Sequence, residues 1–152
     1  EGFWYKARQC YLEAVQLNDR HEAYALGMAE ASFHLGQLEE ANSWYELAIE
    51  MAPEDTSCWL RYATFLLETK QPERALELIE EAELNTCGTA LAYGRVACLY
   101  ALGRRDEARY LLHDALAQDY SLHPVLFDIW PAIQEDAEMM QVIYAFQALP
   151  DH

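Results

Sequence analysis

Apolar and small residues recur at intervals of three and four along most of the chain, which is the spacing of amphipathic helices. The pattern predicts helices over residues 1–18, 21–35, 38–51, 56–69, 72–84, 90–102, 106–118 and 137–148. A shorter apolar helix is expected after His123-Pro124, and Pro131 should kink or end it. The chain is therefore predicted to be all-α.

Single glycines, prolines and polar residues mark the breaks between these helices. We expect Gly36 and Gly103 to end helices in the left-handed conformation. Pro53 cannot continue the helix before it, and Thr56 is expected to cap the helix that follows. The turns between helices are short, so neighbouring helices should pack as antiparallel pairs.

The helix pairs repeat. Ala41 and Ala48 lie seven residues apart, and the same alanine pair returns 34 residues later, 33 residues after that, and 34 residues earlier, as Ala75 and Ala82, Ala108 and Ala115, and Ala7 and Ala14. This period predicts complete repeats at residues 22–55, 56–89 and 90–121. Residues 1–20 are expected to be the second helix of a truncated repeat. Residues 122–152 are expected to be atypical C-terminal capping helices, or alternatively the start of a further diverged repeat.

Composition narrows the class of partner. Hydrophobic residues make up 53% of the chain, which excludes a disordered segment. The net charge of −16 argues against binding to nucleic acid or to an anionic membrane. The apolar runs fall short of the ~20 residues that a membrane helix needs, and no export leader is visible. We therefore expect a cytoplasmic protein with a neutral or basic protein partner.

The sequence offers no pattern of catalytic or metal-binding residues. Its four cysteines and five histidines show no metal-ligand spacing, and we expect the cysteines to be small buried thiols. No phosphate-binding glycine loop or nucleophile setting is present. We predict that the chain is not an enzyme and needs no cofactor.

The repeats resemble tetratricopeptide repeats. That family has a small residue at position 8 of its 34-residue unit, alanine at 20 and 27, an aromatic residue at 24 and proline at 32. Here these places are taken by Ala29, Ala63 and Ala97, by the alanine pairs, by Tyr11 and Tyr45, and by Pro53, while Trp59 and Tyr93 supply the large residue at position 4. The resemblance covers Trp4 to about Asp119. It implies a right-handed all-α superhelix of antiparallel helix pairs, acting as a scaffold or adaptor.

In that family the first helix of each repeat lines a concave groove, which receives a peptide segment or helix of a partner. We call positions 2, 5, 6, 9, 12 and 13 of each repeat the groove positions. In this chain they are Ala23, Leu26, Gly27, Glu30, Phe33 and His34; then Ser57, Leu60, Arg61, Thr64, Leu67 and Glu68; then Leu91, Gly94, Arg95, Cys98, Ala101 and Leu102. The expected partner-binding residues are Arg61, Arg95, Glu30, Phe33, His34, Leu60, Thr64 and Leu67.

Each part of this site has an alternative. Arg61 and Arg95 are expected to hold successive carboxylates of an extended peptide, or else to pair with Glu30 and Glu68 and neutralise the groove. The apolar groove residues either contact the ligand or serve ordinary helix packing. The whole chain could instead be a self-assembly module, such as a homodimer through its exposed N-terminal helix, or a regulatory appendage of a larger protein.

Overall fold

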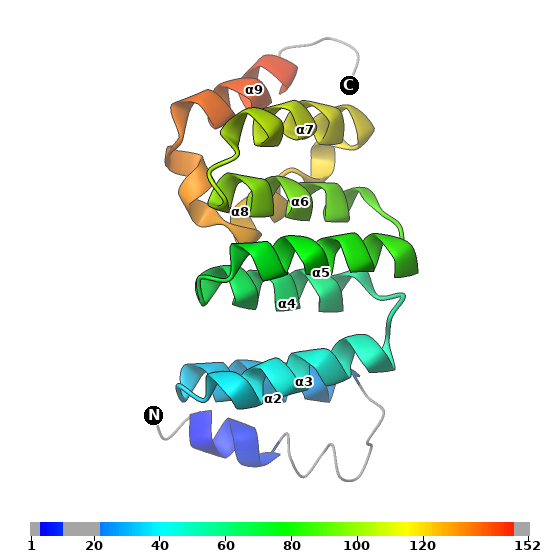
Figure 1. Ribbon diagram of the computed structural model, residues 1–152, viewed down its shortest axis with the longest axis vertical. Coiled ribbons are helices and arrows are strands. Elements are labelled where there is room, and N and C mark those ends of the chain that lie inside the picture. The colour runs from blue at the N-terminus through cyan, green and yellow to red at the C-terminus, as the bar shows by residue number, and fades with distance from the viewer. Residues whose placement is uncertain (1–3, 11–21, 148–152) are drawn as a thin grey trace. The chain divides into compact units, whose positions relative to one another are not determined.

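The computed structural model describes residues 4–10 and 22–147, and the regular structure within them is helical (Figure 1). A helical segment at residues 4–10 comes first. It is followed by α2 (Glu22–His34), α3 (Leu38–Met51), α4 (Thr56–Glu68), α5 (Pro72–Asn85), α6 (Thr89–Ala101), α7 (Arg105–Gln118), η1 (Tyr120–Leu122), α8 (Pro124–Ile129), η2 (Pro131–Glu135) and α9 (Ala137–Gln147). Predictions for residues 1–3, 11–21 and 148–152, including those for Tyr11 and Ala14, lie outside the described residues.

The chain divides into two compact units, Glu1–Tyr62 and Ala63–His152. In the first unit, α2 and α3 form a helix pair joined by a short turn. The start of α4 is attached to α3 through Tyr62, whose hydroxyl donates to Asn42 Oδ1 at 2.7 Å and whose ring stacks on Tyr45 with centroids 5.5 Å apart. In the second unit, α6 packs against α5, α7 and α8, and α9 packs against α7.

The predicted helix boundaries agree closely with the structure. Helix α3 has the expected bounds, and Pro131 begins a new 3-10 helix after α8 ends at Ile129. The expected cap was wrong by one residue. Helix α4 already begins at Thr56, and Asp55 caps it because the Asp55 Oδ1 atom accepts from the Ser57 backbone N–H at 3.0 Å.

The alanines that defined the repeat form the contact surfaces between helices. Ala41, Ala48, Ala75, Ala82, Ala108 and Ala115 are all fully buried, at 0% exposure. A methyl side chain lets two helix backbones approach closely, and larger side chains such as Tyr62, Leu78 and Leu112 fill the remaining space. The sequence period is therefore a packing period.

Three turns between paired helices share one backbone conformation. Gly36 and Gly103 adopt the predicted left-handed conformation, with φ of 81° and 82°, and Lys70 takes the same role with φ of 63°. In each turn the next N–H bonds back to the helix five residues earlier: Gln37 to Ser32, Gln71 to Leu66, and Arg104 to Leu99. These bonds satisfy the carbonyls at the helix end, as in a Schellman motif.

Lys70 is strained where its two counterparts are glycines. A side chain in the left-handed region costs roughly 1–2 kcal/mol, part of which glycine gives back through its greater freedom in the unfolded chain. We expect Lys70→Gly to raise the free energy of unfolding by about 1 kcal/mol, measured by urea denaturation. Gly36→Ala is the matched control and should lower it. A Lys70→Gly variant that is less stable than wild type would contradict this account of the turn.

Candidate partner-binding surface

The groove positions of the first two repeats include exposed polar side chains. On α2, Glu30 and His34 are exposed, and on α4 the exposed groove-position residues are Ser57, Arg61 and Glu68. These residues recur at intervals of four and seven, so in each helix they share one face. Each of these two helices therefore carries polar groups on a face that a partner can reach.

Arg61 is exposed and has no carboxylate within ion-pair distance among the described residues. Its helix neighbours three and four positions away are Ser57, Cys58, Thr64 and Phe65, none of which is acidic, and no carboxylate of another described element lies within ion-pair distance. Other arginines do find carboxylates, since Arg8 pairs with Glu40, Arg104 with Glu107 and Arg109 with Glu138. The Arg61 guanidinium is thus available to a ligand.

Arg95 is in a different situation. It is half-buried on α6 and forms an ion pair with Glu83 of α5. The alternative interpretation of Arg95 as a paired residue is therefore supported, but the expected partners were wrong, because Glu83 on the preceding helix takes the place of Glu30 or Glu68. Arg61 belongs to the first compact unit and Arg95 to the second. A joint grip on one peptide by both arginines stays a prediction.

His34 is partly covered from within the chain. Its ring stacks on Trp4 with centroids 4.0 Å apart and planes 10° from parallel, and Phe33 lies tilted against it at 5.6 Å. Arg8 of the same N-terminal segment pairs with Glu40 on α3. Residues 4–10 are therefore held against the α2–α3 pair by one stacked ring and one ion pair.

The apolar groove residues of the first two repeats divide into core and surface. Leu67 is only 2% exposed and Leu26 is also buried, so these two fit the helix-packing alternative. Phe33, Leu60 and Thr64 keep intermediate exposure. Phe33 and Leu60 therefore still present apolar surface to a ligand.

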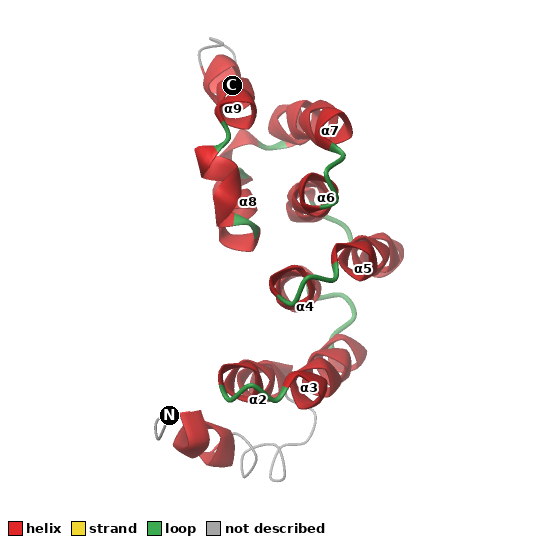
Figure 2. Ribbon diagram, turned by 60° about the vertical axis from the view of Figure 1, so that its left-hand side comes forward, coloured by secondary structure: helices red, strands yellow, loops and turns green. Residues whose placement is uncertain are grey.

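The third repeat differs from the first two. Every residue of α6 is at least partly buried, and its groove positions include Leu91 at 2% exposure and Cys98 at 0%. Helices α5 and α7 pack against α6, and so does α8 of the C-terminal segment, residues 122–152 (Figure 2). The sequence analysis missed this. The signal was present, because the groove positions of this repeat are nearly all apolar whereas the earlier repeats have Glu30, His34, Ser57 and Glu68 there.

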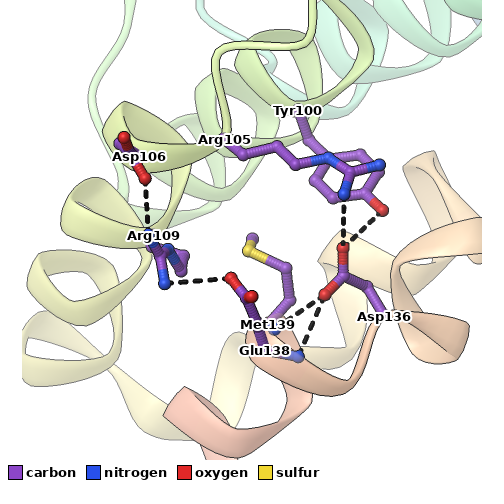
Figure 3. Close-up of polar contacts among 7 residues, drawn as sticks. All are labelled: Tyr100, Arg105, Asp106, Arg109, Asp136, Glu138 and Met139. Atoms are coloured by element: carbon purple, nitrogen blue, oxygen red, sulfur yellow. Dashed lines mark hydrogen bonds and ion pairs between the residues drawn. The ribbon is translucent and has the colours of Figure 1, made fainter.

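Two tyrosines of α6 bind the residues at the two ends of the segment 119–136, which contains α8. The Tyr93 hydroxyl donates to the Asp119 carbonyl at 2.8 Å, and the Tyr100 hydroxyl donates to Asp136 Oδ2 at 2.8 Å (Figure 3). Arg105 Nη1 lies 3.7 Å from the same Asp136 oxygen. Burial and the neighbouring carboxylate raise the pKa of Tyr100, so this phenol remains a hydrogen-bond donor.

Asp136 also begins the last helix. Its Oδ1 atom accepts from the backbone N–H groups of Glu138 and Met139, at 3.0 and 3.2 Å, as an N-cap of α9. The Tyr100 hydroxyl, these two N–H groups and Arg105 together hold the pKa of the Asp136 carboxyl below its usual value of 3.8. Two residues further on, Glu138 Oε2 forms an ion pair with Arg109 Nη1 at 3.0 Å (Figure 3).

The expectation of buried thiols is right for two cysteines and wrong for two. Cys58 and Cys98 are buried, and desolvation raises the pKa of each thiol to about 12, which leaves both protonated and unreactive. Cys10 and Cys87 are exposed, and neither occupies one of the repeating core positions. All four are free.

Within residues 4–10 and 22–147, His, Cys, Asp and Glu side chains form no group of three or more that could hold a metal ion. Nor does this part of the chain contain a helix with the length and apolar character needed to span a bilayer.

Comparison with known proteins identifies the repeat. Residues 24–55 match the family described as tetratricopeptide repeat. Among solved structures, the chain is similar to YrrB, described as a TPR protein with an unusual peptide-binding site. The TM-score is 0.59 at 23% sequence identity, and the match covers 99% of this chain and 80% of that one. This likeness supports an all-α solenoid of helix pairs. A search of curated proteins found no match.

The lowered pKa of Asp136 predicts a pH-dependent contribution to stability. A carboxyl whose pKa is depressed by folding stabilises the fold above its unfolded pKa, and this contribution is lost as the pH falls through the folded value. Asp136→Asn keeps a capping oxygen but loses the charge, so we expect it to lower the free energy of unfolding by about 1 kcal/mol at pH 7.

The difference in stability between wild type and Asp136→Asn should narrow as the pH drops below 3.8, measured by urea denaturation at several pH values. Asp128→Asn, at an exposed position of α8, is the control and should change little at any pH. If the Asp136→Asn variant differs from wild type by the same amount at every pH, the assignment is contradicted.

Proposed function

We propose that this chain, which carries a tetratricopeptide repeat within residues 24–55, binds an extended segment of a partner protein through the groove positions of its first two repeats. The match to this repeat and the likeness to a TPR protein support a protein-interaction scaffold in general. The proposal adds where the partner binds and what chemistry it offers. The proposed contacts within the first compact unit are Arg61, Leu60, Glu30, Phe33 and His34.

The observation that carries the proposal is the state of Arg61. In a chain with 26 acidic and ten basic Lys and Arg residues, an exposed guanidinium without a carboxylate partner in the described part of the chain is unexpected. A guanidinium binds carboxylates in a two-pronged geometry, and such charge-assisted hydrogen bonds are about twice as strong as neutral ones. The ligand should therefore bring a side-chain or terminal carboxylate to Arg61.

The rest of the chain constrains the partner further. A net charge of −16 repels anions at long range, so a strongly acidic partner would associate slowly. The exposed Glu30 favours a basic group on the ligand, and Phe33 and Leu60 favour an apolar side chain. The partner segment is therefore expected to be basic overall, with one carboxylate and at least one large apolar residue.

The likeness to YrrB supports peptide binding as a use of this fold, since that protein is described as having a peptide-binding site. The contacts proposed for this chain rest on the exposure and charge of its own groove-position residues. Self-assembly and a role as an appendage of a larger protein remain predictions. The molar mass in solution, measured with and without residues 1–18, tests whether the N-terminal helix mediates a homodimer.

Peptides selected from a random display library on the immobilised chain test the role of Arg61. We expect selected sequences to be enriched in a carboxylate flanked by basic and apolar residues. Arg61→Ala should weaken binding of a selected peptide at least tenfold by calorimetry, because a hydrogen bond to a charged group contributes about 1.5–3 kcal/mol. Arg61→Lys should recover only part of this loss, because it keeps the charge but not the planar fork.

Arg104→Ala is the matched control, because Arg104 is an exposed arginine that already pairs with Glu107 at the start of α7. It should leave affinity unchanged. If Arg61→Ala binds the selected peptides as tightly as the wild-type chain, the proposed site is wrong.

A further inference from the structure

We infer that residues 120–136, which we call the strap, are an internal ligand of the third repeat, able to leave the groove face of α6 while the rest of the chain stays folded. The inference rests on the proposed function, because it treats the groove positions as a binding face. It adds that α8 covers this face in the third repeat, whereas the groove positions of the first two repeats include exposed polar side chains.

The first observation is the contrast between equivalent helices. The groove positions of α2 and α4 include exposed Glu30, His34, Arg61 and Glu68, whereas in α6 none is exposed and Cys98 is wholly buried. The strap supplies the cover, since α8 packs on α6 (Figure 2). A bound partner would be expected to bury the groove positions in the same way.

The second observation is the amphipathic form of the strap. Within α8, Leu126 and Ile129 are buried three residues apart while Asp128 is exposed, and Ile133 of the separate 3-10 helix η2 is also buried. Apolar anchors at helical spacing with a polar outer face are the pattern by which short helices bind grooves in other proteins. The strap thus has the composition of a ligand helix.

The third observation is that α6 recognises both ends of the strap. Tyr93 holds the Asp119 carbonyl where the strap begins, and Tyr100 holds the Asp136 carboxylate where it ends. These tyrosines lie seven residues apart on α6, about two helical turns. Arg105, near Asp136, adds a positive charge at the same end (Figure 3). The α6 face therefore fits a short apolar helix followed by a carboxylate.

The strap consists of short elements that we expect to leave α6 together. Its elements have only three, six and five residues, and Pro124 and Pro131 start two of them, so it cannot merge into one long helix. Helices shorter than about 12 residues are marginal in water without tertiary contacts. The strap therefore depends on α6 for its structure, and its release is a local opening at the end of the repeat array.

The contacts between the strap and α6 indicate which features a partner of the third repeat would need. A partner segment with aliphatic anchors three residues apart, closed by a carboxylate, would compete with the strap for α6. Until it does, partner binding is confined to the open groove positions of the first two repeats.

Cys98 provides a test that needs no identified partner. In a Cys10→Ser, Cys87→Ser background, the two buried thiols, Cys98 and Cys58, remain. Leu126→Asp with Ile129→Asp should release the strap and increase the reaction rate of Cys98 with a small disulfide reagent at least tenfold. Cys58, in the first compact unit, should stay protected, and far-UV circular dichroism should show that the helices of the second unit are retained.

A synthetic peptide of residues 119–136 completes the test. Added to the Leu126→Asp, Ile129→Asp chain, it should bind and protect Cys98 again, and it should not bind the chain whose own strap is intact. A peptide carrying the same two aspartates should do nothing. Tyr93→Phe with Tyr100→Phe is a milder variant that should speed the Cys98 reaction without introducing charge into the core.

Three results would overturn the inference: Cys98 remains protected in both variants, Cys98 and Cys58 become reactive together, or the peptide fails to restore protection. The first means that the strap does not cover Cys98, and the others mean that the strap is an inseparable part of the core. None of them involves Arg61 or the selected peptides. A negative result with the strap variants therefore does not contradict the proposed function. A negative result with Arg61→Ala likewise does not change how the reactivity of Cys98 is interpreted.

Discussion

Close helix contact at recurring alanines is the constraint on which the rest of the structure depends. Six alanines spaced by the repeat are fully buried, and each allows two helix backbones to approach without a gap. A larger side chain at these positions would separate the helices and move every groove position on them. The turns serve the same packing, because the left-handed residues Gly36, Lys70 and Gly103 end each first helix at the same point.

Much of the fold was predictable because this packing is periodic. Helix α3 and the proline breaks follow directly from residue spacing, and Gly36 and Gly103 identified their own turns. Lys70 could not be recognised as a left-handed residue from its type, because only its place in the repeat marks it. The Asp55 cap was missed for a similar reason, since a one-residue offset depends on the local backbone path.

The residues at the groove positions could be predicted from the repeat, but their exposure and ion pairs could not. Register places Arg61 and Arg95 equivalently, yet one is exposed and the other pairs with Glu83. The difference arises from neighbours on other helices, which a repeat alignment does not reveal. Likewise, a capping role for the C-terminal segment follows from solenoid logic, but its contact with α6 depends on the hydrogen bonds from Tyr93 to Asp119 and from Tyr100 to Asp136. The apolar groove positions of the third repeat were the available clue.

The central claim is that α8 covers the groove face of α6, whereas the groove positions of α2 and α4 include exposed polar side chains. Nuclear Overhauser effects between methyl groups measure this contact in solution. The account predicts cross-peaks from Leu126 and Ile129 of α8 to Leu91 at a groove position of α6, since all three are buried and the two helices pack together. Assigned spectra in which α8 methyl groups show no cross-peak to α6 would contradict it.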